Sequence, residues 1–155
     1  MAVFDNKKLF DEDKVNKSLE STVWGTPPEI FNPINKEFGF TLDVCAIAEN
    51  AKAVRFFTPI DNGLKQPWDN EVCWCNPPYG REVGRWVEKA FRESGSQGGP
   101  TIVMLLPART DTAWFHDYIL GKAEIRFLRG RLYFNDTPNG RAPFPSMVVV
   151  FGTKL

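Results

Sequence analysis

Asn76-Pro77-Pro78-Tyr79 is the segment of this sequence whose residue types are best suited to chemistry. Each proline fixes its own φ and lacks an N–H, so the corner is stiff and its carbonyl groups are held outward. Asn76 adds an amide oxygen, and Tyr79 adds a flat ring. Together these groups suit the binding of a planar –NH2 group, which indicates chemistry on the amino group of a base or of an amide.

The exocyclic amine of adenine is a poor nucleophile, because its lone pair is delocalised into the ring. Fixed acceptors that hold its N–H groups stabilise the positive charge that builds during attack. Asn76 Oδ1 and the Pro77 carbonyl oxygen are the natural acceptors, and Tyr79 would stack on the ring. A duplex base must leave its stack to reach such a corner. The donor must be strongly electrophilic, as a sulfonium methyl is, and held in line with the amine.

The same four residues also suit a rigid surface turn, and a match this short arises by chance. The surroundings favour a functional corner. The strand-like run Glu71–Cys75 precedes it, and the amphipathic segment Val83–Ser94 follows it. A functional interpretation of a motif at a strand end is favoured when the motif lies between a strand and a helix.

The spacing of apolar residues and the positions of turn residues predict the elements that hold this corner. The expected helices are Pro27–Phe38, Val83–Ser94 and Thr112–Leu120. The expected strands are a run from Phe40 that ends near Asp43, Arg55–Thr58, Glu71–Cys75, Thr101–Leu106, Ala123–Phe127, Arg131–Phe134 and Met147–Phe151.

Cap residues set the expected ends of these helices. Thr26 is a suitable N-cap for the first helix, with Pro27 at its first position and Glu29 completing a capping box. Gly39 should end that helix. Asp111 is a suitable N-cap for the helix that starts at Thr112.

Strands that alternate with helices indicate an α/β fold with a largely parallel sheet, to which the late strands would add an antiparallel edge. In such sheets, ligands bind beyond the carboxyl ends of the strands. Asp43, Asn76 and Arg109 each follow a strand-like run. We therefore expect these three side chains to converge on one rim of the sheet.

The composition is that of one ordinary globular domain. The chain has 155 residues, of which 43% are hydrophobic and 25% are charged. Its formal net charge is zero, so binding to nucleic acid would need a local basic patch. Three cysteines and one histidine offer no zinc pattern, which predicts free thiols in a reducing compartment and no metal. Neither a signal peptide nor an apolar run long enough to span a bilayer is seen.

Five segments in order resemble the small phage and prophage DNA N6-adenine methyltransferases. The segments are Trp24-Gly25-Thr26-Pro27, Leu42-Asp43-Val44-Cys45-Ala46, Asn76-Pro77-Pro78-Tyr79, Leu106-Pro107-Ala108-Arg109-Thr110-Asp111 and Arg129-Gly130-Arg131. The resemblance runs from about Val23 to Phe151. It implies an S-adenosylmethionine-dependent enzyme with an abbreviated Rossmann-like fold, a mostly parallel central sheet and helices on both faces. Residues 1–21 would be a flexible arm, and residues 22–155 a single catalytic domain.

The resemblance also implies a set of site residues. The catalytic motif would be Asn76, Pro77, Pro78 and Tyr79. The cofactor would be held by Trp24, Thr26 and Pro27 near its methionine end, by Asp43 and Ala46 near its ammonium or ribose, and by Asp61 and Leu64 around its adenine. Apart from the resemblance, position favours arginines that would contact DNA phosphates, and the candidates are Arg81, Arg85, Arg109, Arg129 and Arg131. Arg129 and Arg131 suit a solvated sheet edge protected by charge equally well.

The sequence departs from the wider methyltransferase pattern in two ways. The segment after Asp43 lacks the glycine-rich loop that lets the backbone approach a cofactor closely. In addition, only about 30 residues separate Asp43 from Asn76, too few for the usual two or three βα units, since one βαβ unit takes ~30. Both departures concern how the cofactor is held more than the type of reaction.

Adenine-containing DNA with a flipped target base is the expected substrate, inside the cytoplasm of a bacterial host cell. An RNA adenine or a protein glutamine amide would fit the same corner, and an inactive nucleic-acid-binding protein is a further alternative. No separate base-reading domain is present in the sequence, which favours low sequence specificity or a homodimer.

Overall fold

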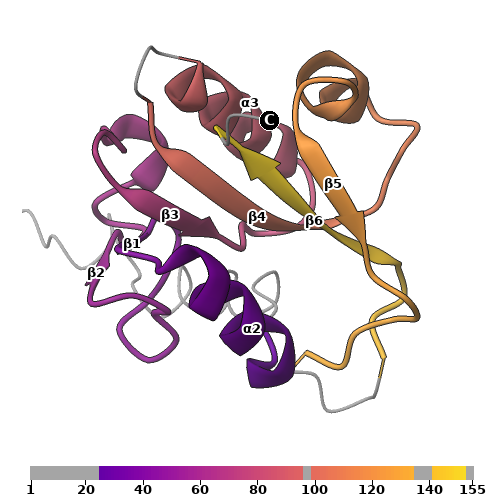
Figure 1. Ribbon diagram of the computed structural model, residues 1–155, viewed down its shortest axis with the longest axis horizontal. Coiled ribbons are helices and arrows are strands. Elements are labelled where there is room, and N and C mark those ends of the chain that lie inside the picture. The colour runs from indigo at the N-terminus through magenta and orange to yellow at the C-terminus, as the bar shows by residue number, and fades with distance from the viewer. Residues whose placement is uncertain (1–24, 96–98, 135–140, 153–155) are drawn as a thin grey trace, which may run out of the picture.

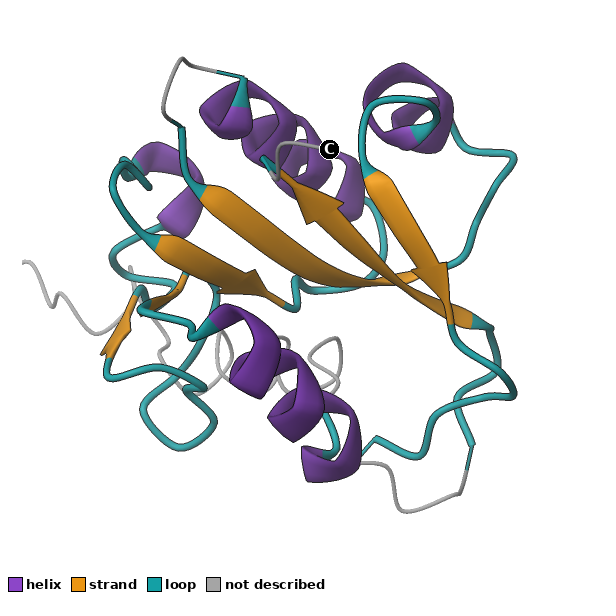
Figure 2. Cartoon of the chain, viewed as in Figure 1, coloured by secondary structure: helices purple, strands orange, loops and turns teal. Residues whose placement is uncertain are grey.

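The computed structural model describes residues 25–95, 99–134 and 141–152, and Figures 1 and 2 show the arrangement of their elements. The expected arm at residues 1–21 and Trp24 lie outside these ranges. The helical elements are α2 (Pro28–Phe38), η2 (Gly63–Lys65), α3 (Val83–Ser94) and η3 (Phe115–Ile119). The strands are β1 (Leu42–Asp43), β2 (Arg55–Phe56), β3 (Val72–Cys75), β4 (Thr101–Pro107), β5 (Glu124–Phe127) and β6 (Ser146–Phe151).

The strands form one six-stranded sheet in the order β2-β1-β3-β4-β6-β5. Strand β1 pairs in parallel with β2 and β3, and β3 pairs in parallel with β4. Strand β6 is antiparallel to both β4 and β5. The predicted α/β class is confirmed, with a sheet that is mixed. The antiparallel strand was expected at an edge, but β6 lies between β4 and β5 because its continuous apolar run fills a fully buried position.

Helices cover both faces of the sheet, as Figure 1 shows for α2 and α3. Side chains alternate between faces along a strand. Trp74 of β3 packs edge-on against Phe31 of α2, with ring centroids 5.1 Å apart. Its neighbour Cys73 points the other way, where its thiol meets the carbonyl of Trp68, and Trp68 stacks on Trp86 of α3. The expected layers are therefore observed.

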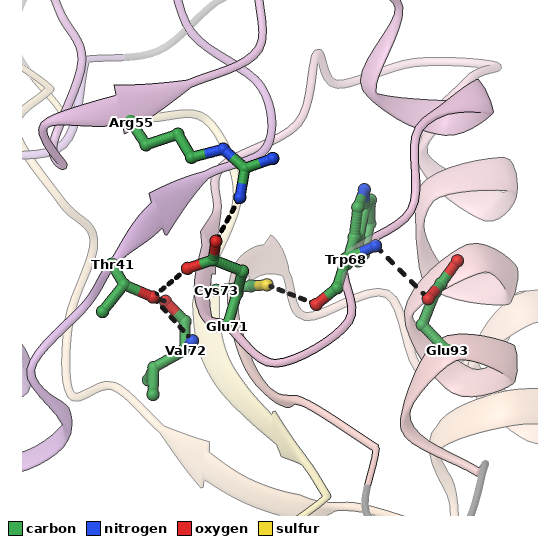
Figure 3. Close-up of polar contacts among 7 residues, drawn as sticks. All are labelled: Thr41, Arg55, Trp68, Glu71, Val72, Cys73 and Glu93. Carbon is green, nitrogen blue, oxygen red and sulfur yellow. Dashed lines mark hydrogen bonds and ion pairs between the residues drawn. The ribbon is translucent and has the colours of Figure 1, made fainter.

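A carboxylate joins the beginnings of three neighbouring strands. Glu71, just before β3, accepts hydrogen bonds from the Thr41 hydroxyl before β1 and from the guanidinium of Arg55 in β2 (Figure 3). The Thr41 hydroxyl also accepts a hydrogen bond from the backbone N–H of Val72 at 2.9 Å. These contacts fix the relative register of β1, β2 and β3 at their amino ends, which leaves the carboxyl ends for a site.

The predicted capping box of the first helix is wrong. Helix α2 begins one residue later than expected, Pro27 occupies the N-cap position, and no side chain caps the helix. The physical reason is that the Thr26 hydroxyl faces the end of β3 and accepts a hydrogen bond there. The other end is as expected: Gly39 ends the helix with φ +67°, a conformation that glycine adopts without strain.

The helix predicted over Thr112–Leu120 is present over residues 113–119, but most of it is the π-helix η3. In η3 the Leu120 N–H donates to the Phe115 carbonyl oxygen at 2.9 Å, the i→i+5 spacing of a π-helix. Asp111 is not the cap. The Thr112 hydroxyl takes that role, because it accepts a hydrogen bond from the Phe115 N–H and donates one to the Arg109 carbonyl oxygen at 2.8 Å.

The predicted strand Arg131–Phe134 is also wrong. Gly130 has φ +74° and turns the chain after β5, so the residues that follow do not join the sheet. Their backbone pairs instead with a segment before β6, where the Ala142 N–H donates to the Leu132 carbonyl oxygen at 2.8 Å. The apolar alternation of this segment reflects packing on the site described below.

Candidate active site

The topology places the expected residues on one rim. Strands β1, β3 and β4 are mutually parallel, so Asp43 at the end of β1, Asn76 after β3 and Arg109 after β4 share one edge of the sheet. Strand β5 runs in the same direction, because both it and β4 are antiparallel to β6. The residues after β5, including Arg129, therefore begin at this edge as well.

Asn76 is held by a residue fifty positions earlier in the chain. Its side-chain Nδ2 donates a hydrogen bond to Thr26 Oγ1 at 2.9 Å, and both side chains are nearly buried, with exposed fractions of 8% and 1%. This bond orients the amide, because the nitrogen faces Thr26 and Oδ1 occupies the other branch of the amide plane. A neutral, oriented acceptor at a strand end is what the corner was expected to supply.

The two prolines divide the corner between the core and the surface. Pro77 is buried, whereas Pro78 is partly exposed and lines a cavity. Gly80 follows with φ +128°, which turns the chain toward the start of α3.

Tyr79 is packed more tightly than a ring free to stack would be. Only 9% of it is exposed, and its hydroxyl donates to the Leu105 carbonyl oxygen of β4 at 3.1 Å. Phe144 packs edge-on against it with centroids 5.3 Å apart, and Phe134 does the same at 6.3 Å. Burial raises the pKa of the phenol well above its ordinary range, so the hydroxyl stays protonated.

A cavity of about 270 Å³ opens beside the corner. Three segments line it: residues 44–46 after β1, residues 57–59 and 62–64 after β2, and Pro78 with Glu82 and the first turn of α3. Of the predicted site residues, it contains Ala46, Leu64, Pro78 and Arg85. Between Asp43 and Asn76, loops that line a pocket therefore stand in place of the usual βα units.

Gly63 lets the loop after β2 pack directly against the segment after β1. A side chain at this position would overlap the carbonyl oxygen of Val44 and would come within 3.1 Å of the ring of Trp86. The Gly63 carbonyl also accepts a hydrogen bond from the indole N–H of Trp68 at 2.9 Å. Gly63 is therefore required by packing within the protein, at the wall of the cavity. Its place in the Asn62-Gly63 pair indicated a turn but gave no sign of this contact.

Asp43 holds a loop that borders the cavity. One carboxylate oxygen accepts the Cys45 N–H at 3.2 Å, and the other accepts the Lys52 N–H at 2.9 Å. Only 3% of the residue is exposed, and burial raises the pKa of the carboxyl to about 7, against the lowering effect of these two bonds. Asp43 does not itself line the cavity. The structure places it behind the loop that does.

Asp61 has a similar local role at the surface. Its carboxylate accepts the backbone N–H of Thr58 at 2.8 Å and the Thr58 hydroxyl at 3.0 Å. The bond from the backbone N–H of Thr58 is the main reason that the pKa of Asp61 is lowered. Asp61 shapes the turn that lines the cavity without lining it itself.

The five predicted phosphate-binding arginines fall into two groups. Arg85 pairs with Glu82 at 3.1 Å, and both residues line the cavity. The others are exposed and form no ion pair with any residue that the structure describes: Arg81, Arg109, Arg129 and Arg131. In the same described ranges, no group of three or more His, Cys, Asp or Glu side chains is placed to hold a metal ion. No helix there is long and apolar enough to cross a membrane.

Known proteins share this arrangement of segments. The model of the DNA N-6-adenine-methyltransferase (Dam) family matches residues 14–151. The chain belongs to this family. It is 32% identical over 145 residues to the DNA N-6-adenine-methyltransferase of Haemophilus phage HP1 (strain HP1c1), which covers 89% of this chain and 83% of that protein. It is 35% identical over 112 residues to the DNA N-6-adenine-methyltransferase of Escherichia phage T1, covering 71% of this chain and 46% of that protein.

In this Dam-family chain, some of the predicted site residues lie together and others do not. The structure brings Thr26 to Asn76, and it brings Ala46, Leu64 and Pro78 together around the cavity. It keeps Asp43 and Asp61 behind the cavity wall. Pro27 is buried beside Thr26. Sequence reasoning did not identify the rest of the cavity lining, which includes Gly63, Glu82 and Trp86.

Replacing Gly63 with alanine should destabilise the fold and shrink the cavity, because the new methyl group would overlap the Val44 carbonyl. Overpacking of this kind typically costs about 1–3 kcal/mol. The unfolding free energy in urea measures it. Gly95→Ala is the matched control, since its Cβ would lie 3.3 Å from its nearest contact, the carbonyl oxygen of Phe91. Equal stability of the two variants would contradict the close approach at Gly63.

Stability should depend on the ionisation of Asp43. Its folded pKa of about 7 exceeds the unfolded value near ~4, so the folded state retains the proton more strongly. The contribution of the protonated carboxyl to the free energy of unfolding is therefore complete below about pH 4. This contribution, as much as ~4 kcal/mol, is lost as the pH rises through 7.

Asp43→Asn should remove that part of the decline in unfolding free energy between pH 4 and pH 8. Asp61→Asn serves as the control, because that exposed carboxyl has a lowered pKa and should leave the decline in place. A decline that persists unchanged in Asp43→Asn would show that the carboxyl is not responsible.

Proposed function

We propose that this chain transfers a methyl group from S-adenosylmethionine to the N6 amine of adenine in DNA. The observation that carries the proposal is the amide of Asn76, held by Thr26 at the carboxyl edge of the sheet and beside a cavity. Membership of the Dam family supports both the reaction and the substrate. We also propose that the six-stranded sheet is an abbreviated Rossmann-like methyltransferase fold.

The cavity suits the nucleoside part of the cofactor. Its volume of about 270 Å³ is near the lower end of ligand pockets, roughly 300 Å³, so it would hold part of a cofactor of this size rather than all of it. Gly63 and Ala46 add no bulky side chain to its walls, and Phe57 and Trp86 offer aromatic surface. The Glu82 carboxylate is suited to accept hydrogen bonds from ribose hydroxyls. We therefore assign Arg85, its ion-pair partner, to the cofactor side rather than to DNA.

The segment before α2 would face the other end of the cofactor. Thr26 and Pro27 are buried next to Asn76, which suits a role near the methionine end, as does the position of Trp24 just before the described residues. When bound, S-adenosylmethionine supplies an electrophilic sulfonium methyl group. Asp43 would act indirectly, by holding the loop after β1.

Asn76 and Pro77 would hold the target amine. Asn76 Oδ1 and the Pro77 carbonyl oxygen each accept one N–H, which favours the charge that develops on the nitrogen as the C–N bond forms. No general base is required, since the proton leaves after the transfer. Neutral acceptors are adequate for this step, and the corner contains no ionisable group except the protonated Tyr79 hydroxyl.

Tyr79 would stack on the flipped adenine once the ring is uncovered. Phe144 now packs edge-on against it, so a base that enters must displace Phe144 or slide between the two rings. The exposed arginines Arg81, Arg109, Arg129 and Arg131 surround this edge and suit phosphate contacts. We propose the cytoplasm of a bacterial host as the place of action, since the compared methyltransferases come from phages.

The decisive experiment identifies the methylated product. The protein is incubated with S-adenosylmethionine labelled in its methyl group and with unmethylated DNA, RNA or a protein extract, and each product is hydrolysed and analysed by mass spectrometry. We expect label in N6-methyldeoxyadenosine from DNA. Label in RNA adenosine or in a glutamine amide would favour the alternative substrates, and no label in any pool would favour an inactive binding protein.

Asn76→Ala should lower the rate of methyl transfer by at least ~100-fold, as removal of one fixed transition-state hydrogen-bonding group does elsewhere. The dissociation constant for S-adenosylmethionine, measured by calorimetry, should stay within a few fold, because the cavity does not include Asn76. Asn32→Ala, an exposed change on α2, is the control. A collapse of cofactor affinity in Asn76→Ala alone would contradict the proposed role.

A further inference from the structure

Two short extended segments form a paired strip over the catalytic corner. The strip comprises residues 131–134 and 141–144, joined by the hydrogen bond from the Ala142 N–H to the Leu132 carbonyl oxygen at 2.8 Å. Burial alternates along both segments, so one side of the strip faces the protein and the other faces solvent.

The inner side of the strip packs on the Asn-Pro-Pro-Tyr corner. Its buried residues are Leu132, Phe134, Ala142 and Phe144. Two of them, Phe134 and Phe144, meet Tyr79 edge-on. The inner side of the strip is therefore held against the residue that the proposed function assigns to the target base, and the outer side of the same strip faces solvent.

The outer side carries an unusual exposed aromatic residue. Tyr133 is 55% exposed, although nothing in its position on an extended segment requires an aromatic ring there. Arg141 holds it from the neighbouring segment: its Nε donates to the Tyr133 hydroxyl at 2.8 Å, and its guanidinium lies over the ring, 5.3 Å from the centroid. The ring is thereby fixed in place while more than half of the residue remains accessible.

The charge of this surface has one sign. Arg131 and Arg141 lie on the outer side, and Arg129 lies at the turn that leads into the strip. Residues 128–134 and 141–145 contain no acidic side chain. Because the whole chain has a formal net charge of zero, this is a local concentration of positive charge. Such a surface complements a polyanion.

We propose that the outer side of the strip is a DNA-binding surface on which Tyr133 stacks against a base that flanks the target adenine. The inference rests on the proposed function, since it needs a DNA substrate at the neighbouring corner. A flipped adenine leaves the adjacent base with an uncovered face. A ring held rigid by Arg141 can cover that face, while Arg129 and Arg131 contact phosphates.

The test compares the binding of fluorescein-labelled DNA, single-stranded and duplex, by fluorescence anisotropy over a series of salt concentrations. Tyr133→Leu should weaken binding about 5- to 100-fold, the range expected for the loss of one stacked base. Tyr133→Phe keeps the ring and should stay within about threefold of the wild type. Arg131→Ala should lower the slope of log affinity against log salt by about one on duplex DNA.

Arg92→Ala is the matched control for charge, because Arg92 is an exposed arginine of α3 that pairs with Glu88. It should leave both affinity and salt slope unchanged. Cofactor affinity and the unfolding midpoint, measured for every variant, should match the wild type, because Tyr133 and Arg131 are exposed and lie outside the cavity.

The outcomes separate the two proposals. If the wild type methylates DNA adenine but Tyr133→Leu binds DNA as tightly as Tyr133→Phe, the stacking surface is overturned and the proposed function stands. If the wild type neither binds nor methylates DNA, both are overturned. A loss of affinity that is equal in Tyr133→Leu and Tyr133→Phe would assign the effect to the hydroxyl and its arginine, and it would also overturn stacking.

Discussion

The hydrogen bond between Asn76 Nδ2 and Thr26 Oγ1 is the interaction on which the site depends. It joins the residue before α2 to the residue after β3, in a place where both side chains are nearly buried. A polar group that is buried in this way is expensive to leave without its partner, so the bond specifies one arrangement of the two segments. The same bond explains why α2 lacks a side-chain cap, because the Thr26 hydroxyl faces the site instead of the helix.

The corner held by this bond separates two unlike environments. On one side lies the cavity, with small residues, a ring and one ion pair around it. On the other side Tyr79 lies under the aromatic residues of the paired strip. For the proposed transfer of a methyl group from a cofactor to a base, such a division would keep the two binding areas apart until they meet at the amide.

Much of this fold follows from short-range patterns in the sequence. Helix α3 and strand β4 have the periodicity and the apolar runs expected of them, and the rim formed by Asp43, Asn76 and Arg109 follows from the parallel order. Contacts between distant segments could not be predicted. Gly63 is needed because the loop after β2 packs on Val44, and Thr26 does not cap α2 because its hydroxyl bonds Asn76 at the end of β3. Arg131–Phe134 alternates like a strand because it packs on Tyr79, not because it joins the sheet.

The most direct test of the account is the single-turnover rate of methyl transfer for Thr26→Val and Thr26→Ser, measured with saturating S-adenosylmethionine. Valine keeps the shape of threonine without the oxygen, whereas serine keeps the oxygen. We expect Thr26→Val to be slower by at least ~10-fold, the equivalent of one net buried hydrogen bond, and Thr26→Ser to stay near the wild-type rate. Equal rates for the two variants would contradict the claim that Thr26 orients Asn76 for the reaction.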